Sequence, residues 1–518
     1  MKTIRFSIII TFIIFAAVIS SCKKDPEKKA NFTFEITALD SFFIKYPDYK
    51  PYAKEMTELY QKHEFHYIWY DKDGRIDLAD VLYNKSNQIA ADGVIAKIPY
   101  KANLDKLFNE SENKSPQVNK DLLVSALYFF YTKKVMEGVD PQKSKETGWY
   151  LPRVKVSYVD YLDTLMKDPG LIKKDESEMI SQYYKLKKGL KRYRDIQQKG
   201  GWGTITLPEG IKSIKENEIS PTVAQVRKRL FITGDLSADS QSATFDTDLK
   251  NGLANYQKRY NRKPDNLITP NLVKEMSISV EERIKTIIVN MERCRWIDPD
   301  IAESKELIAV NIPSYTLQYR QNNKVILTSN VVVGKDLNKT VVFSGQMSYI
   351  VFSPYWNIPT SILEKEIKPG IDKDANYLEK HNMEWNGNQV RQKPGAENSL
   401  GLIKFMFPNS NNIYLHDTPA KSLFGKDNRA FSHGCVRVEK ARDLAIEILK
   451  NDKNWTPAKI DAAMHTGKES QYSLKRKIPV YIAYFTAWAD DNGNVSFYDD
   501  VYNRDGRLAN LLYTETAK

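Results

Sequence analysis

Two short segments decide how this chain is interpreted: Tyr414-Leu415-His416-Asp417-Thr418 and, after a loop, Ser432-His433-Gly434-Cys435-Val436-Arg437. A histidine ends an apolar strand candidate, and a cysteine follows 19 residues later beside a glycine and a second histidine. Cysteine catalysis needs a thiolate, a base that forms it and donors for the oxyanion. The two segments offer all three, because Gly434 also lets the backbone approach a substrate closely. A helix expected at 438–450 would direct its N-terminal dipole at Cys435 and favour the thiolate.

Two other roles are open to Cys435. A lone cysteine is most often a small buried hydrophobe. His416, His433 and Cys435 could also ligate zinc, but no fourth ligand is evident and the usual HxxxH and CxxC spacings are missing, so we expect no metal. No glycine-rich phosphate loop follows a strand candidate, so we expect no nucleotide and no other cofactor.

Length and composition set the broad class. A chain of 518 residues predicts about three domains. Its 42% of apolar residues indicate globular domains and exclude a disordered or multi-span membrane protein. The net charge of +12 is dispersed, without a zinc finger or an arginine-rich arm, so we expect no nucleic acid partner. Three cysteines cannot build a disulfide scaffold.

The N-terminus predicts export. Lys2 and Arg5 precede an apolar run of 14 residues, 6–19, which is short for a membrane span and typical of a signal peptide. The run ends Ile19-Ser20-Ser21-Cys22, which resembles a bacterial lipobox. We therefore predict a signal peptide at 1–22, lipidation of Cys22, a tether at 23–31 and a membrane-anchored lipoprotein on the periplasmic side. An uncleaved signal anchor is the alternative.

A helical scaffold is predicted for residues 32–205. Residues 183, 186, 190 and 193 are apolar at helical spacing, and the stretches 52–70 and 119–137 are also helix-like. Residues 213–277 predict a smaller unit of three helices, the last begun by Thr269 as N-cap and Pro270 at the first position. This unit resembles the three-helix peptidoglycan-binding module. It either binds glycan or only spaces the domains.

Strand patterns begin at about residue 305. The stretches 306–312, 315–319 and 325–333 predict strands, the last two flanking a turn at 321–323. Shorter strands are predicted at 347–352, 402–407 and 413–415, and a hairpin joins 480–488 to 495–498. Helices are expected at 438–450 and 456–464. The fold class is therefore a multi-domain α+β chain whose C-terminal domain is mainly β.

The segments around Cys435 resemble the YkuD-type L,D-transpeptidase family, whose motif is a histidine followed, after a loop, by Ser/Thr-x-Gly-Cys-x-Arg or Asn. Other stretches carry the same resemblance, and together they are similar to the large multi-domain YcbB-like subgroup: Asn290-Met291-Glu292-Arg293, 352–359, 391–395, Asn398-Ser399-Leu400-Gly401 and 479–488. The resemblance implies a catalytic domain at 290–505 with a cap insertion at about 359–395. Cys294 departs from the family pattern, and we expect it to be a buried structural thiol.

The resemblance also implies roles for individual residues. Cys435 is the nucleophile, and His416 is its general base and later the acid for the leaving amine. The backbone carbonyl of Asp417 orients the imidazole of His416. The N–H groups of Gly434 and Cys435, with that of His433, form the oxyanion hole. In the competing assignment, His433 is the base. Otherwise its side chain is expected to brace the loop.

Four further residues are candidates for substrate binding. Arg437 either holds a carboxylate of the stem peptide or fixes the loop, and Ser432 is expected to hydrogen-bond within that loop. Trp356 and Tyr414 are candidates for the wall of the groove, with core packing as the alternative for Trp356.

For the activity, the resemblance implies 3→3 cross-linking of peptidoglycan stem peptides, with release of D-Ala from a tetrapeptide donor and inhibition by carbapenems. Expected partners are stem peptides and glycan, the membrane through the lipid anchor and cell-wall synthases. Two other functions stay open, namely an L,D-carboxypeptidase at the same site and a catalytically silent peptidoglycan-binding scaffold.

Overall fold

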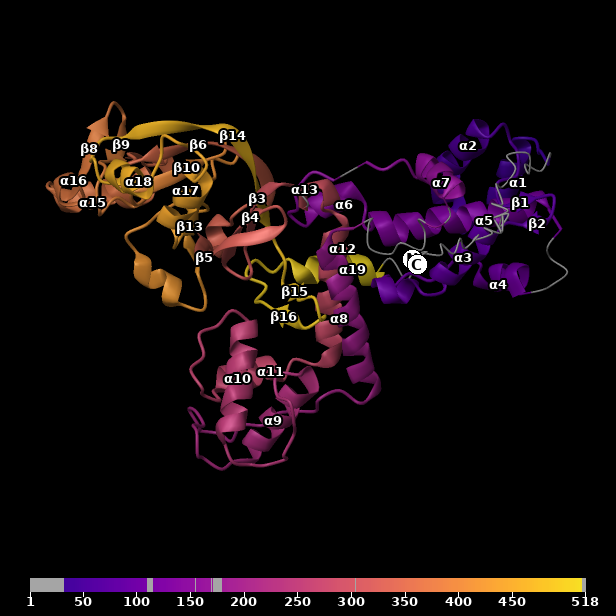
Figure 1. Ribbon diagram of the computed structural model, residues 1–518, viewed down its shortest axis with the longest axis horizontal. Coiled ribbons are helices and arrows are strands. Elements are labelled where there is room, and N and C mark those ends of the chain that lie inside the picture. Colours follow the sequence, from indigo (N-terminus) through magenta and orange to yellow (C-terminus); the bar gives the residue numbers. More distant parts are fainter. Residues whose placement is uncertain are drawn as a thin grey trace, which may run out of the picture. The chain divides into compact units, whose positions relative to one another are not determined.

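The computed structural model describes residues 32–109, 115–153, 155–168, 170, 179–302 and 304–514. The predicted signal peptide, Cys22 and the tether at 23–31 lie outside these residues. The chain separates into two compact units. The first comprises the chain up to Asp80 together with Tyr100–Ala126. The second comprises Val81–Pro99 and the chain from Leu127 onward. Figure 1 labels the elements of both units. In the described part of the chain, every helix is too short or too polar to span a membrane.

The first unit is helical and is organised around one buried carboxylate. Asp121 accepts hydrogen bonds from the Tyr60 hydroxyl at 2.5 Å and from the Trp69 N–H at 2.8 Å. Around it lie α1 (Thr37–Lys45), α2 (Ala53–Lys62), α4 (Lys101–Asn109), the beginning of α3 (Asp77–Ser86), the beginning of α5 (Val118–Tyr131) and the hairpin of β1 (Tyr70–Asp71) and β2 (Gly74–Arg75). The expected helix over 52–70 is wrong in its second half. Helix α2 ends at Lys62, because Asp121 binds the N–H groups of Ile68 and Trp69 that a helix would need.

The helices of the second unit follow the predicted apolar faces. A π-helical turn over Thr132–Glu137 continues α5, so the helical interpretation of 119–137 is confirmed. The elements α6 (Pro141–Glu146) and α7 (Tyr158–Lys167) follow. Helix α8 (Ser181–Gln198) buries its predicted apolar face, Tyr183, Leu186, Leu190 and Tyr193. It packs along α12 (Val280–Arg295), which leads into the C-terminal domain through α13 (Pro299–Ala302).

The expected three-helix unit is present as α9 (Pro221–Thr233), α10 (Thr247–Arg259) and α11 (Pro270–Met276). The Thr269 hydroxyl accepts the N–H of Leu272, and Gly234 ends α9 in a left-handed conformation. The apolar core of these helices is continuous with that of the C-terminal domain. The Arg229 guanidinium also lies 3.7 Å from the centroid of the Trp202 ring.

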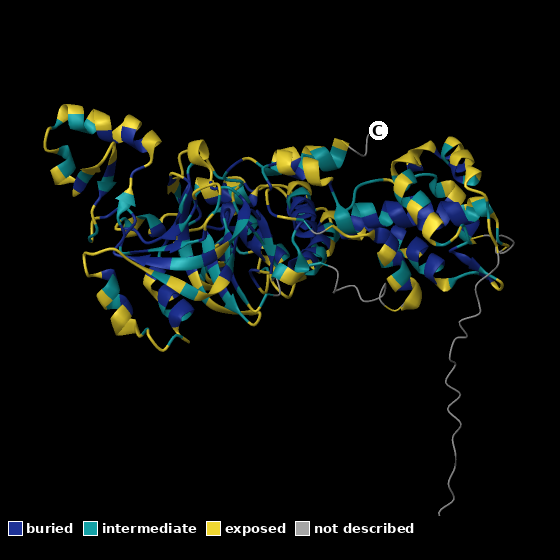
Figure 2. Ribbon diagram, turned by 90° about the horizontal axis from the view of Figure 1, so that it is seen from above, coloured by how far each residue is buried: buried dark blue, intermediate teal, exposed yellow. Residues whose placement is uncertain are grey.

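The C-terminal domain is built on a nine-stranded sheet in the order β12-β5-β13-β11-β10-β6-β14-β3-β4. The sheet also pairs β4 with β5, so most of its strands form a closed ring. Figure 2 shows that buried residues are concentrated among the strands of this domain, whereas exposed residues are concentrated on its outer helices. The strands are β3 (Glu306–Asn311), β4 (Thr316–Gln321), β5 (Lys324–Gly334), β6 (Phe343–Phe352), β10 (Ile403–Met406), β11 (Leu415–His416), β12 (Ala430–Ser432), β13 (Val436–Val438) and β14 (Ser470–Ala483).

Two expectations for this domain need correction. The stretch 480–488 is not one strand, because β14 ends at Ala483 and β15 (Ala487–Ala489) pairs separately with β16 (Val495–Phe497). Between them, the Thr486 N–H donates to Asn290 Oδ1 at 2.9 Å, which turns the chain away from the large sheet. The helix expected at 438–450 begins only at Ala441, as α17 (Ala441–Leu449), because β13 precedes it. Helix α18 (Pro457–Met464) lies where it is predicted.

The insertion expected at about 359–395 forms a small cap with its own core. Its three-stranded sheet has the order β7 (Trp356–Asn357), β9 (Gln389–Gln392), β8 (Met383–Asn386). Its helical part comprises α14 (Thr360–Ile362), a π-helical turn over Leu363–Ile367, α15 (Lys368–Lys373) and α16 (Tyr377–Lys380). The cap cluster contains Ile358, Ile362, Leu363, Ile367, Met383 and Val390.

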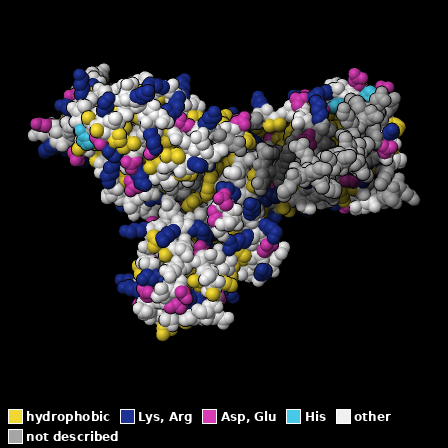
Figure 3. All heavy atoms as spheres, in the orientation of Figure 1, with side chains coloured by type: hydrophobic (Ala, Val, Ile, Leu, Met, Phe, Trp, Pro, Cys, Tyr) yellow, Lys and Arg dark blue, Asp and Glu magenta, His cyan; other side chains and the backbone are white. Residues whose placement is uncertain are grey.

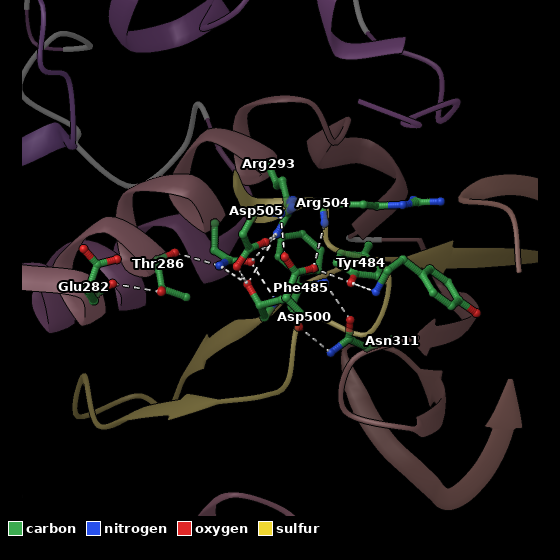
Figure 4. A network of polar contacts seen from close by, with 12 residues as sticks. Glu282, Thr286, Arg293, Asn311, Tyr484, Phe485, Asp500, Arg504 and Asp505 are labelled. Atoms are coloured by element: carbon green, nitrogen blue, oxygen red, sulfur yellow. Dashed lines mark hydrogen bonds and ion pairs between the residues drawn. The ribbon is translucent and has the colours of Figure 1, made fainter. Parts of the chain in front are cut away.

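A buried polar network ties α12 to the end of the chain (Figure 4). Arg293 of α12 forms an ion pair of 2.7 Å with Asp505, which begins α19 (Asp505–Thr514). The Thr486 hydroxyl donates to Asp505 at 2.6 Å and accepts from the Asn290 amide at 2.8 Å. Helix α12, the segment at Thr486 and the start of α19 therefore depend on one another.

Replacing Arg293 by Met should destabilise the second unit strongly. The substitution leaves the Asp505 carboxylate buried without its cation, and breaking such a pair costs about 3–5 kcal/mol. Urea unfolding measures the loss. The matched control is Lys285→Met on the same helix, whose pair with Glu282 is exposed, and it should leave the midpoint nearly unchanged. Equal midpoints for the two variants would contradict this prediction.

Candidate active site

Strand pairing brings the predicted nucleophile and base together. Strand β11 pairs with β13 in parallel, with His416 opposite Arg437, and with β10 in antiparallel register, with His416 opposite Lys404. Directly paired residues point to the same face of a sheet, so Lys404, His416 and Arg437 form one row across three strands. Cys435 precedes β13 directly, and the N–H of the next residue, Val436, donates to the Tyr414 carbonyl at 3.2 Å.

The Cys435 thiol is partly buried and protonated at rest. Its sulfur lies 3.7 Å from the backbone carbonyl oxygen of Asn412. Burial raises the pKa of the thiol above its ordinary value, and hydrogen bonds from Tyr414 and the positive charges of Arg437 and Lys404 oppose this effect. A base must therefore remove the thiol proton before or during attack.

His416 has the environment of a neutral base. Its Nδ1 lies 2.5 Å from the backbone carbonyl oxygen of Asp417, the contact that the family resemblance implies. With the proton on Nδ1, the other ring nitrogen, Nε2, is left as the acceptor. Burial, together with the positive charge of Arg437, lowers the pKa of His416 to about 4. The Asp417 carboxylate is itself fixed by the Leu402 N–H at 3.1 Å and by Lys421 at 2.5 Å.

The loop before Cys435 is held by its own hydrogen bonds. The Ser432 hydroxyl donates to the Cys435 carbonyl at 2.6 Å and accepts the Gly434 N–H at 3.1 Å, as expected for a loop hydrogen-bonder. Thr340 donates to the Gly434 carbonyl at 2.8 Å. Gly434 has φ +117°, which only glycine adopts readily. In this conformation the Gly434 N–H is engaged, whereas the Cys435 N–H bonds to none of the described residues.

The other predicted residues lie at different distances from the chemistry. The ring of Tyr414 lies 5.7 Å from that of His416, centroid to centroid. His433 is exposed, and its Nε2 lies 3.1 Å from Glu366 of the cap. Trp356 belongs to β7, is partly buried and packs against the cap cluster, so its place as a wall of the groove stays a prediction. Arg437 is partly buried, its Nε has no hydrogen-bond partner in the described part of the chain, and burial lowers its pKa.

The expected dipole effect on Cys435 is wrong. Helix α17 begins at Ala441, beyond β13, and a helix dipole acts only within about the first turn. The positive charges near the thiol are instead those of Arg437 and Lys404. Sequence reasoning missed Lys404, because it lies 31 residues before Cys435 and only the strand register brings the two together. The sequence did hold one signal for this residue, namely a lysine within the otherwise apolar stretch 402–407.

The described residues support neither a metal site nor a second reactive thiol. The described residues contain no cluster of three or more His, Cys, Asp or Glu side chains placed to bind a metal. Cys294 is fully buried, as predicted, and burial raises the pKa of its thiol. An apolar cavity of about 160 Å³ lies between α8, β3 and Trp488, and none of the predicted site residues lines it.

Comparison with known families assigns two regions. Residues 305–460 match the YkuD family, described as the L,D-transpeptidase catalytic domain, and this match includes His416 and Cys435. The C-terminal domain is a YkuD-type L,D-transpeptidase catalytic domain. Residues 54–190 match the family described as Scaffold domain. The predicted combination of a helical scaffold with a mainly β YkuD domain is therefore confirmed.

The chain is also similar in part to a curated protein and, weakly, to solved structures. A protein of Haemophilus influenzae named "Putative L,D-transpeptidase" is 36% identical over 243 residues, which are 43% of this chain and 48% of that protein. The chain thus spans about half the length of this curated relative. Among solved structures, the L,D-transpeptidase of Xylanimonas cellulosilytica is 11% identical with a TM-score of 0.19, covering 54% of this chain and 100% of that chain. That of Stackebrandtia nassauensis is 12% identical with a TM-score of 0.22, covering 54% and 97%.

The low pKa of His416 predicts how acylation depends on pH. The imidazole must be neutral to accept the thiol proton, so its contribution is complete above about pH 5 and is lost as the pH falls through about 4. The rate of Cys435 acylation by a carbapenem, followed by mass spectrometry, should show this acid limb. Arg437→Met should move the limb to higher pH, because the positive charge of Arg437 lowers the pKa of His416.

The control for this profile is Arg442→Met, which removes an exposed arginine that pairs with Asp461. In this variant the acid limb of the acylation rate should lie at the same pH as in the wild type. An acid limb near the ordinary histidine pKa of about 6.5 in the wild type would contradict the prediction.

Proposed function

We propose that this protein is an exported L,D-transpeptidase that forms 3→3 cross-links in peptidoglycan through an acyl-thioester on Cys435. The observation that carries the proposal is the placement of a neutral His416, with Nδ1 fixed by the Asp417 carbonyl, on the strand next to Cys435. The match of residues 305–460 to the YkuD family supports the same reaction class. The donor would be a tetrapeptide stem, cleaved after its third residue.

The reaction would proceed in two steps. His416 Nε2 takes the thiol proton while the Cys435 sulfur bonds to the carbonyl carbon of the third residue. The carbon–nitrogen bond to D-Ala then breaks, and His416 returns the proton to the leaving amine. In the second step the side-chain amine of another stem attacks the thioester and gives its proton to His416. The carbon–sulfur bond then breaks, and the Cys435 thiolate takes that proton back.

The donors for the oxyanion belong to the loop before β13. The Cys435 N–H has no other partner among the described residues, so it is the first candidate. The Gly434 N–H could join it only after leaving the Ser432 hydroxyl, which it now contacts. His433 is the weaker candidate for the base, because its ring is exposed and faces Glu366 of the cap.

The regions outside the catalytic domain have supporting roles in this proposal. The scaffold spans 32–205, the three-helix module spans 213–277, and the catalytic domain spans 290–505. The lipobox-like end of the signal peptide would attach the chain to a membrane through Cys22. Lys and Arg side chains are scattered over the face seen in Figure 3 rather than gathered into one patch, which fits weak attraction to an acidic polymer better than a nucleic acid site.

The variant Cys435→Ala should abolish both chemistry and labelling. Soluble protein 25–518 is incubated with a disaccharide-tetrapeptide and, separately, with a carbapenem, and products and adducts are identified by mass spectrometry. The wild type should release D-Ala, form a cross-linked dimer and gain the carbapenem mass, and Cys435→Ala should do none of these.

Cys294→Ala is the matched control, because it removes the other described thiol, which is fully buried. It should keep both reactions. Release of D-Ala with only a tripeptide product would favour the L,D-carboxypeptidase. A wild type with neither adduct nor release would favour the silent scaffold.

The cap insertion is proposed to be a lid over the substrate groove. Its π-helical turn contributes Glu366, which faces His433 next to the nucleophile loop. Replacing 362–385 by a short glycine-serine linker should lower turnover of polymeric cell wall several-fold while the carbapenem still acylates Cys435. Unchanged turnover on the polymer would contradict a lid.

A further inference from the structure

Lys404 is a cation of the active site that has no hydrogen-bond or ion-pair partner among the described residues. The Lys404 side chain is half-buried in β10, and its ammonium forms no hydrogen bond or ion pair with any described residue. Its Nζ lies 5.9 Å from the centroid of the Tyr414 ring. The nearby Glu469 carboxylate accepts the Tyr355 N–H at 2.7 Å and acts on Lys404 only through its charge. A desolvated ammonium is costly unless an anion pairs with it.

The position of Lys404 is set by strand register. Lys404 lies directly opposite His416 on one side, and Arg437 lies opposite His416 on the other. Neighbouring strands are about 4.8 Å apart, so the backbones of Lys404 and Arg437 lie roughly 10 Å from each other, with His416 between them. In the strand order, Cys435 directly precedes β13, and Lys404 belongs to β10, which lies on the other side of β11.

This order of groups matches the geometry of the leaving residue. The acyl carbon must meet the sulfur of Cys435, and the leaving nitrogen must lie within reach of His416, which protonates it. In an amino acid, one tetrahedral carbon separates that nitrogen from the terminal carboxylate. A carboxylate that extends from that nitrogen past His416 would reach β10, where Lys404 offers an ammonium.

We propose that Lys404 binds the terminal carboxylate of the amino acid that acylation expels, and so selects donors whose leaving residue ends in a free carboxylate. The inference rests on the proposed function and adds a substrate-binding residue to it. The bound carboxylate would supply the missing partner of the ammonium. The positive charges of Lys404 and Arg437 also lower the pKa of the Cys435 thiol, but that effect would act equally on every donor.

The test compares two donors that differ only at this carboxylate. Disaccharide-tetrapeptides ending in D-Ala or in its amide are given to the wild type, Lys404→Met and Lys404→Arg, and kcat/KM is measured from release of the terminal residue. The wild type should prefer the free acid by about 10- to 100-fold, the size expected for a charge-assisted hydrogen bond. Lys404→Met should lose this preference because its kcat/KM falls only for the donor with the free carboxylate. Lys404→Arg should restore part of the preference.

The control variant is Lys426→Met, whose ammonium lies over the exposed ring of Phe431, and thermal unfolding checks that every variant folds. A wild type without preference for the free acid, or a Lys404→Met variant that slows both donors equally, would overturn the role of Lys404. A wild type that releases neither terminal residue would overturn the proposed function itself, and the inference with it.

Discussion

The parallel pairing of β11 with β13 is the constraint on which the active site depends. It sets His416 beside Arg437 and places Cys435 at the entry of the neighbouring strand. Parallel neighbours need a long connection, and here the chain between them passes through β12, which pairs with β5 at the edge of the sheet. The loop that follows β12 is then fixed by Ser432 and by Thr340. A shift of one residue in this register would turn the base away from the nucleophile.

Burial determines the protonation states at the site. It lowers the pKa of His416 to about 4 and raises that of the Cys435 thiol, so the resting site holds a neutral imidazole and a thiol rather than a preformed ion pair. The carbonyl of Asp417 fixes the tautomer of the imidazole without adding a negative charge. The positive charges of Arg437 and Lys404 then favour the thiolate as it forms, and they stay available to anionic groups of a substrate.

The rest of the second unit holds this sheet in place. Helix α12 supplies Arg293, whose ion pair with Asp505 joins the helix to the end of the chain across Thr486. The continuous apolar core runs from the three-helix module into the sheet. The cap has a separate cluster, so it can pack by itself while Glu366 faces the loop that carries His433. The sheet that carries the nucleophile and the cap therefore have separate apolar clusters.

The sequence by itself determined the elements and the chemistry that local patterns carry. Periodicity predicted α8 through its four buried apolar residues, and Thr269 and Pro270 predicted the start of α11. The motif around His416 and Cys435 predicted a base and a nucleophile through its family resemblance. Only the tertiary structure decided what depends on distant contacts. Asp121 ends α2 early, Thr486 divides the stretch 480–488, and β13 separates Cys435 from α17. Lys404 enters the site through strand register alone, because a sequence shows which residues alternate along a strand but not which strand lies beside it.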